Sequence, residues 1–271
     1  MLQDYRQLTV DQLEALEKQT LRTVVQALQE YSREAKDIFD NTPAPTENEV
    51  IVLAEDLLQY ALEVAEAYPI NKRFAGFIDY KRVRWISTPF GLLPQVLLVD
   101  AKASTENNRT TLQQSQLSMT ADFQSRGQDY QLLPGVAPHL SITSHLGNEL
   151  PAITTSIFIH YYYNKLANNQ PPFRLLKSIY VIGLPHQNLK FRYNPNAAMT
   201  FFGQGKHSPA RQEVPRIRVY FSRLRDMCPW RLQELNYFDG ELYTKPLWRD
   251  VTQMDDGRIQ VVMHLFEFIG R

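Results

Sequence analysis

The chain has 271 residues, of which 44% are hydrophobic and 21% are charged, and its formal net charge is zero. A globular core of this size needs no disulfide or structural metal, and the single cysteine, Cys228, excludes a disulfide framework and a multi-cysteine zinc site. The sequence shows no signal peptide and no apolar run of membrane-spanning length, so we expect a reducing, cytoplasmic setting and no membrane partner.

The zero net charge hides two segments of opposite sign. Residues 1–66 hold fourteen acids and five bases, whereas residues 190–231 hold nine bases and two acids. A segregated basic zone can act as an electrostatic footprint for nucleic acid even on a neutral chain. The alternative is a solvated basic face with no partner.

Helical signals dominate the N-terminal part. Apolar residues at helical spacing predict one long amphipathic helix over 9–39, begun by a capping box at Thr9 and Gln12. A proline-containing break follows, and a second helix is predicted from about 47 to 67.

The remainder of the chain is rich in residues that favour β-strands. Strands are predicted over 73–86, 95–102, 152–163, 176–185, 216–221 and 258–269. Residues 104–117 are predicted to form a capped polar helix, 120–150 to be rich in loops and 194–215 to form a long polar loop. The fold is therefore predicted to be α/β (α+β mixed), a single domain over 1–271. Its parts are a helical segment (1–70), two strands and a following helix (73–120) and the basic region (190–231).

One strand ends in an acid and a base. Alternate strand residues share a face, so Asp100 and Lys102 should point the same way at the C-terminal end of their strand. The short connection between strands 73–86 and 95–102 predicts antiparallel neighbours, which could bring Asp79 beside Asp100. A strand-end ion pair is the alternative interpretation.

Two carboxylates and one ammonium group suit metal-assisted phosphodiester hydrolysis. Mg²⁺ prefers a few carboxylate oxygens, polarises the phosphate and lowers the pKa of a bound water. Lys102 could orient that water and balance developing charge. Glu55, on the preceding helix, is the candidate for a further metal ligand.

The basic region contains a candidate reading strand. Strand spacing places Arg216, Arg218 and Tyr220 on one face and apolar residues on the other. Arginines one strand repeat apart can each contact a guanine through O6 and N7. The preceding loop offers Lys206, His207 and Arg211 for bases or phosphates.

Three other features have ordinary structural interpretations. His160, in an apolar strand, is interpreted as a hydrogen-bonded core or interface histidine, and Cys228 as a packed thiol. The tyrosine run 161–163 is interpreted as a half-buried strand edge.

Taken together, five stretches resemble the SfiI family of type II restriction endonucleases, in the PD-(D/E)xK superfamily. They are "RFAGFIDYKRVRW", "LLPQVLLVDAKAST", "FFGQGKHSPAR", "RIRVYF" and "CPWRLQEL". The similarity extends from the first helix to about residue 250, and Ile78 stands where the motif usually has proline before Asp79.

The resemblance implies a PD-(D/E)xK nuclease core with a central mixed sheet flanked by helices and a C-terminal β-rich DNA-reading region. It implies a homotetramer, a dimer of dimers, that binds double-stranded DNA and cuts two GGCCNNNNNGGCC sites in concert, leaving 3′ overhangs. Mg²⁺ would be the cofactor; Mn²⁺ could substitute, and Ca²⁺ would bind without supporting cleavage.

By position, the resemblance also assigns residues. Asp79 and Asp100 would bind metal, the Ala101 carbonyl would be a further ligand and Lys102 would assist the attacking water. Lys206 and the arginines of "RIRVYF" would read the G·C half-site.

Two other functions remain open on the sequence. One is a nuclease of the same fold that acts in repair or recombination and reads DNA structure. The other is a DNA-binding protein without catalysis, in which the acids and Lys102 form structural ion pairs.

Overall fold

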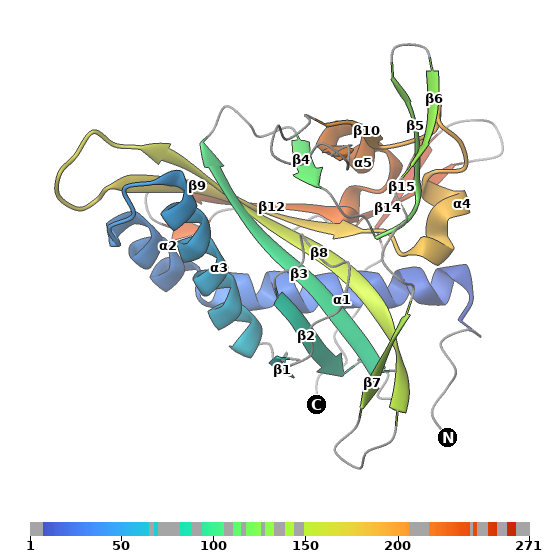
Figure 1. The fold of residues 1–271 in the computed structure, drawn as a ribbon, viewed down its shortest axis with the longest axis horizontal. Helices are drawn as coiled ribbons and strands as arrows, with labels where there is room; N and C mark the ends of the chain where they lie inside the picture. The colour runs from blue at the N-terminus through green and yellow to red at the C-terminus, as the bar shows by residue number, and fades with distance from the viewer. Residues whose placement is uncertain are drawn as a thin grey trace.

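The structure is a computed structural model, shown in Figure 1. It describes residues 8–64, 68–69, 82–87, 94–105, 111–114, 118–125, 128–132, 139–143, 149–205, 217–238, 241–242, 249–253 and 259–263.

A mixed β-sheet forms the centre of the molecule (Figure 1). Its strand order is β1-β2-β3-β8-β9-β12-β13, and β7 also pairs with β8. The bounds are β1 Tyr68–Pro69, β2 Arg82–Ser87, β3 Pro94–Thr105, β7 His139–Thr143, β8 Glu149–Lys165, β9 Arg174–Leu184, β12 Leu232–Phe238 and β13 Glu241–Leu242. β3 and β8 run parallel, whereas β2 pairs with β3 antiparallel. The predicted mixed fold and the predicted antiparallel pair are confirmed.

The tyrosine run lies in the middle of this sheet. β8 has β3 on one side and β9 on the other, and Tyr161, Tyr162 and Tyr163 are all buried. The interpretation as a half-buried strand edge was therefore wrong. Phe39 stacks on Tyr161 with ring centroids 5.7 Å apart, so aromatic packing fills this part of the core.

Three helices precede the sheet: α1 Val10–Glu30, α2 Ser32–Asn41 and α3 Glu47–Val64. The capping box at Thr9 and Gln12 is present. The single helix predicted over 9–39 was wrong, because Tyr31 leaves the helical region at φ −104°, ψ 16°. This break lets α2 pack against β9 while α1 contacts both α3 and β9.

A smaller sheet of three strands, in the order β10-β11-β4, lies beside the central one. Its members are β10 Phe202–Gln204, β11 Ile217–Tyr220 and β4 Thr111–Gln114. The helix predicted over 104–117 was wrong: β3 continues to Thr105, and β4 pairs antiparallel with β11. Strand pairing with a distant segment overrides the local capping signals.

Short elements complete the described fold. They are β5 Ala121–Ser125 with β6 Gln128–Leu132, β14 Arg249–Gln253 with β15 Ile259–Met263, helices α4 Lys190–Tyr193 and α5 Phe221–Met227, and 3₁₀ turns η3 Gln187–Leu189 and η4 Pro229–Arg231. Strands therefore lie within the loop-rich segment 120–150 and within the long loop predicted over 194–215. Of the helices described, none has the length and apolar character needed to cross a membrane.

A buried ion pair joins α1 to the C-terminal part. Arg231 Nη2 lies 2.6 Å from Glu17 Oε2, and both side chains are almost inaccessible to solvent. Glu17 Oε1 also accepts a hydrogen bond from the backbone N–H of His186 at 2.7 Å. Burial raises the pKa of Glu17, and the nearby guanidinium of Arg231 acts in the opposite direction. The pair thus fixes α1 across the β9 end of the sheet.

Candidate active site

Asp100 and Lys102 meet at the C-terminal half of β3. Lys102 Nζ lies 2.5 Å from Asp100 Oδ2. The side chain of Asp100 is 1% exposed and that of Lys102 is 30% exposed, so the acid is enclosed and the base reaches solvent. The pair confirms the predicted sharing of a strand face. It combines a buried oxygen donor with an accessible ammonium group.

The opposite face of β3 is turned toward α1. Gln95, which by alternation lies on the other face from Asp100, accepts a hydrogen bond from Thr20 Oγ1 of α1 at 3.0 Å. Asp100 and Lys102 therefore point away from α1. Parallel pairing with β8 and antiparallel pairing with β2 hold the strand from both sides up to Val99.

The described metal-ligand candidates are all oxygen donors. Asp100 is buried on β3, the Ala101 carbonyl belongs to the same strand, and Glu55 is buried on α3, which packs against β3. Asp79 lies outside the described residues. Within the part of the chain that is described, no group of three or more His, Cys, Asp or Glu side chains gathers as a metal site. These donors suit a hard cation such as Mg²⁺ better than a thiophilic metal.

The candidate reading strand, β11, has the predicted two faces. Ile217 and Val219 of β11 are buried, whereas Arg218 and Tyr220 are half-exposed. Arg218 Nε is buried and makes no hydrogen bond to any described residue. The remaining predicted reading residues, Lys206, His207, Arg211 and Arg216, lie outside the described residues.

Tyr220 is held between a glycine and an arginine. A Cβ added to Gly203 on the neighbouring strand β10 would overlap the Tyr220 ring, so only glycine leaves room for it. On α5, the Arg223 guanidinium carbon lies 4.7 Å from the centroid of the same ring. This stacking is a cation–π contact that orients the arginine beside the reading strand. The sequence did not predict either contact with Tyr220.

Next to Lys102 the structure reveals a polar cluster that the sequence did not predict as a unit. His160 of β8 pairs in register with Lys102, and Tyr162 pairs with Ser104. His160 is buried and hydrogen-bonded, as predicted, and Cys228 is also buried. The available signal was the spacing of Lys102 with Ser104 and of His160 with Tyr162, but it becomes informative only once the β3–β8 register is known.

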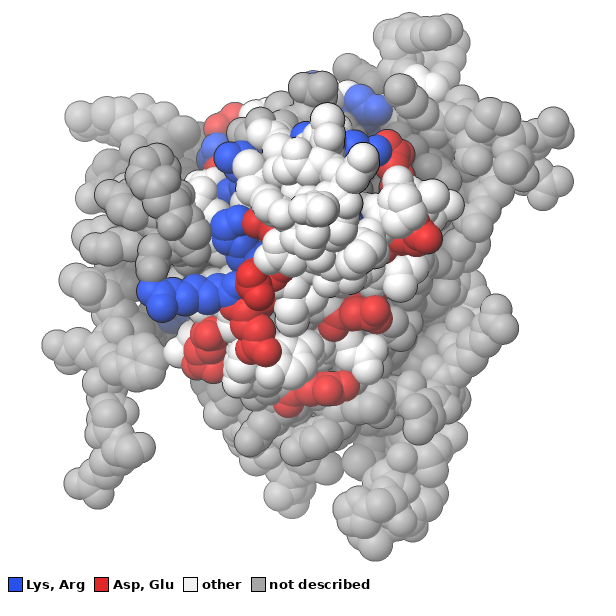
Figure 2. Space-filling view, turned by 90° about the vertical axis from the view of Figure 1, so that its left-hand side faces the viewer, with Lys and Arg blue, Asp and Glu red and all other residues white. Residues whose placement is uncertain are grey.

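The end of the molecule formed by α2 and α3 carries a different charge. Figure 2 shows acidic side chains spread over this face, with basic side chains gathered toward one side. The exposed acids of the two helices are Glu34, Asp37, Glu47, Glu49, Asp56 and Glu63. A phosphate backbone is repelled by such a surface, so we expect DNA to approach from another side.

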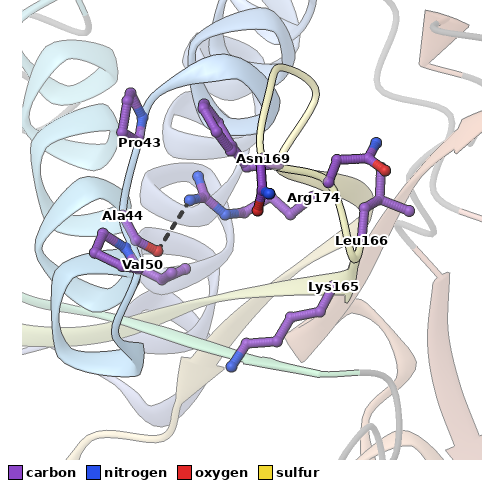
Figure 3. A pocket seen from close by; sticks show the side chains of 10 residues that line it. Pro43, Ala44, Val50, Lys165, Leu166, Asn169 and Arg174 are labelled. Carbon is purple, nitrogen blue, oxygen red and sulfur yellow. Dashed lines mark hydrogen bonds between the residues drawn. The ribbon is translucent and has the colours of Figure 1, made fainter.

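A pocket also lies at this end, between the α2–α3 connection and the β8–β9 turn (Figure 3). Arg174 points into it, but its guanidinium donates hydrogen bonds to the carbonyls of Phe39, Thr42 and Ala44. Lys165, at its rim, lies 4.0 Å from Glu47. These cations hold the loop between the two helices, and the pocket belongs to the scaffold.

Comparison with known proteins identifies close relatives. The family model described as type II restriction enzyme SfiI matches residues 45–235. A type II restriction enzyme SfiI from Streptomyces fimbriatus is 64% identical over 253 residues, which cover 93% of this chain and 94% of the relative.

Two solved structures share the fold. The crystal structure of tetrameric restriction endonuclease SfiI bound to cognate DNA matches with a TM-score of 0.80 and 61% identity, covering 98% of this chain and 99% of that one. Restriction endonuclease BglI, bound to its DNA recognition sequence, matches with a TM-score of 0.64 over 83% of this chain and 90% of that one. At 14% identity, the likeness to BglI concerns the fold alone.

Proposed function

Because the chain belongs to the SfiI family of type II restriction enzymes, we propose that it hydrolyses phosphodiester bonds of double-stranded DNA at GGCCNNNNNGGCC and leaves 3′ overhangs. It acts as a homotetramer, a dimer of dimers, that cuts two sites in concert in the cytoplasm. The solved relative that is tetrameric and bound to cognate DNA supports this assembly. Because the chain belongs to a family of restriction enzymes, we do not propose the alternative of a repair or recombination nuclease.

The observation that carries the proposal is the contact of Asp100 with Lys102 on one face of β3. In this proposal, the carboxylate binds the metal and the ammonium group points toward the scissile phosphate. Lys102 balances the buried charge of Asp100 before DNA arrives, then orients the attacking water and stabilises developing negative charge. Its greater exposure supports this role, because a group that meets DNA must be accessible.

The oxygen donors on β3 suit Mg²⁺, and Asp79, Asp100 and the Ala101 carbonyl would hold it, with Glu55 as the candidate fourth donor. When bound, Mg²⁺ polarises the phosphate and lowers the pKa of a bound water. Burial of Asp100 contributes a carboxylate whose position is fixed by the pairing of β3 with β8.

Sequence recognition is proposed for the basic region. Arg216 and Arg218 on β11, with Lys206 from the preceding loop, read the G·C pairs of one half-site, and His207, Arg211 and Tyr220 add base or phosphate contacts. A two-fold site is read by two protomers, one for each half. The unspecified centre needs only backbone contacts and shape.

Cleavage assays on two plasmids test the function. With Mg²⁺, the protein should cut a plasmid that carries the GGCCNNNNNGGCC site and leave a matched plasmid without the site intact. Equal cleavage of both plasmids would contradict sequence-specific recognition.

Two substitutions test the site. Asp100→Asn and Lys102→Ala should abolish cleavage and keep binding to the cognate duplex in Ca²⁺. Lys36→Ala is the matched control, since Lys36 forms a similar pair with Asp40 on α2. Full cleavage by either β3 variant would refute the site assignment and would favour a structural ion pair.

A further inference from the structure

The last part of β3 is tied to β8 by side chains. His160 Nε2 lies 2.9 Å from Ser104 Oγ, and His160 Nδ1 lies 3.0 Å from Tyr162 OH. Both ring nitrogens thus have hydrogen-bond partners while the side chain is almost entirely buried. Because Ser104 follows Lys102 by one strand repeat, the first bond fixes β3 directly beyond the lysine.

This link reinforces the backbone pairing of β3 with β8. The two strands pair from Gln95 and Ile153 to Thr105 and Tyr163, so Lys102 and Ser104 both lie within this ladder. A side-chain cross-link from His160 adds to the backbone hydrogen bonds and further restricts the segment that carries Lys102.

Aromatic packing fixes the histidine ring in turn. His160 and Tyr162 stack with centroids 4.1 Å apart, and Tyr162 meets the edge of Tyr180 at 5.1 Å. Tyr180 stacks on Phe221 at 5.5 Å, and Phe221 is the first residue after the reading strand β11. The ring thus has a rigid backing that extends to the end of β11.

The histidine is also neutral. Burial lowers the pKa of His160 to about 3, and the neighbouring positive charge of Lys102 acts in the same direction. A neutral imidazole provides one donor and one acceptor, which matches its two hydroxyl partners. It also places no competing charge beside Lys102, whose ammonium remains directed at Asp100.

We propose that His160 is a positioning residue for Lys102: through Ser104 and Tyr162 it holds the end of β3 so that the ammonium group faces Asp100 and the scissile phosphate. The inference rests on the proposed nuclease function. His160 itself does not reach DNA, because it is 4% exposed. Its effect is therefore expected on the cleavage step and not on binding.

Single-turnover cleavage of bound DNA, measured beside affinity for the same duplex in Ca²⁺, tests this role. His160→Leu replaces the imidazole by an apolar side chain of similar size and removes both hydrogen bonds. Cleavage should slow by about 10- to 100-fold, the usual effect of a misplaced catalytic group, while affinity stays unchanged. His160→Gln restores a donor and an acceptor and should recover most of the rate. His186→Gln is the matched control, because it removes another buried histidine, one that caps η3.

Ser104→Ala keeps the test decisive if His160→Leu folds poorly, since it removes one hydrogen bond and leaves the core intact. Ser104→Ala should slow cleavage, and adding His160→Leu should slow it by less than the product of the separate effects. Wild-type rates in folded His160→Leu and Ser104→Ala would overturn the proposal, as would parallel losses of rate and affinity. If Lys102→Ala instead cleaves normally, the proposed active site fails and not merely this inference.

Discussion

Replacing His160 should change how the stability of the protein depends on pH. The pKa of a free histidine is about 6.5, and burial lowers that of His160 to about 3 in the folded protein. Between these two pH values His160 is protonated in the unfolded chain but not in the folded protein. The contribution of His160 to the free energy of unfolding therefore falls as the pH drops below 6.5, and it recovers as the pH rises through this window.

The size of the effect follows from the two pKa values. At pH 5 the unfolded histidine is almost fully protonated and His160 in the folded protein is not. Going from pH 7 to pH 5 should thus reduce the free energy of unfolding by about 2 kcal/mol through this one residue. The variant His160→Gln has no titrating group here and should lose about 2 kcal/mol less than the wild type over the same interval.

Chemical denaturation at pH 7 and pH 5 measures this difference, with all proteins at one concentration because the protein is proposed to be a tetramer. Tyr237→Phe serves as the control, since it removes a different buried hydroxyl, one that donates to the Ser32 carbonyl, and should keep the wild-type pH dependence. An identical pH dependence in the wild type and His160→Gln would refute the reasoning. It would mean that His160 accepts a proton in the folded protein, and that the neutral state assigned to it is wrong.

Three further outcomes are expected. Arg218→Ala should remove roughly 1–3 kcal/mol of discrimination at one G·C pair, measured by binding to cognate and singly substituted duplexes; equal weakening on all sequences would indicate a phosphate contact. Gly203→Ala should reduce the free energy of unfolding by roughly 1–3 kcal/mol, because its Cβ overlaps the Tyr220 ring, and adding Tyr220→Ala should relieve part of that cost in denaturation experiments. Glu17→Gln should cost roughly 3 kcal/mol in the same assay, because Arg231 loses its buried counter-charge, whereas the double variant with Arg231→Met should cost less.

The parts of the site that the sequence predicted depend on local alternation. A strand places alternate residues on one face whatever its neighbours are, so the shared faces of Asp100 with Lys102 and of Arg218 with Tyr220 could be predicted without a fold. The continuous apolar run before Asp100 likewise predicts a strand covered on both faces. The β3–β8 register is not local, and the contact of His160 with Ser104 follows from it.

The wrong predictions have a similar cause. The helix expected over 9–39 has continuous helical spacing, yet it breaks at Tyr31 because α2 packs on β9 and brings Phe39 onto Tyr161. The tyrosine run is a second wrong prediction, since it was interpreted as a half-buried strand edge. In the structure, aromatic stacking and a hydrogen bond between Tyr162 and His160 make a central position possible.

The segment wrongly predicted as a helix over 104–117 contains β4, which completes the three-stranded sheet around β11. Instead of a helix, the chain leaves β3 at Thr105 and enters β4 at Thr111, which pairs with β11. Without β4, β11 would pair with β10 alone, and an isolated two-stranded sheet is marginally stable. With β4, Arg218 lies on the middle strand of three, and residues 106–110 connect this sheet to the strand that carries Lys102. The strand that carries Lys102 is therefore followed in the chain by a strand that pairs with the one that carries Arg218.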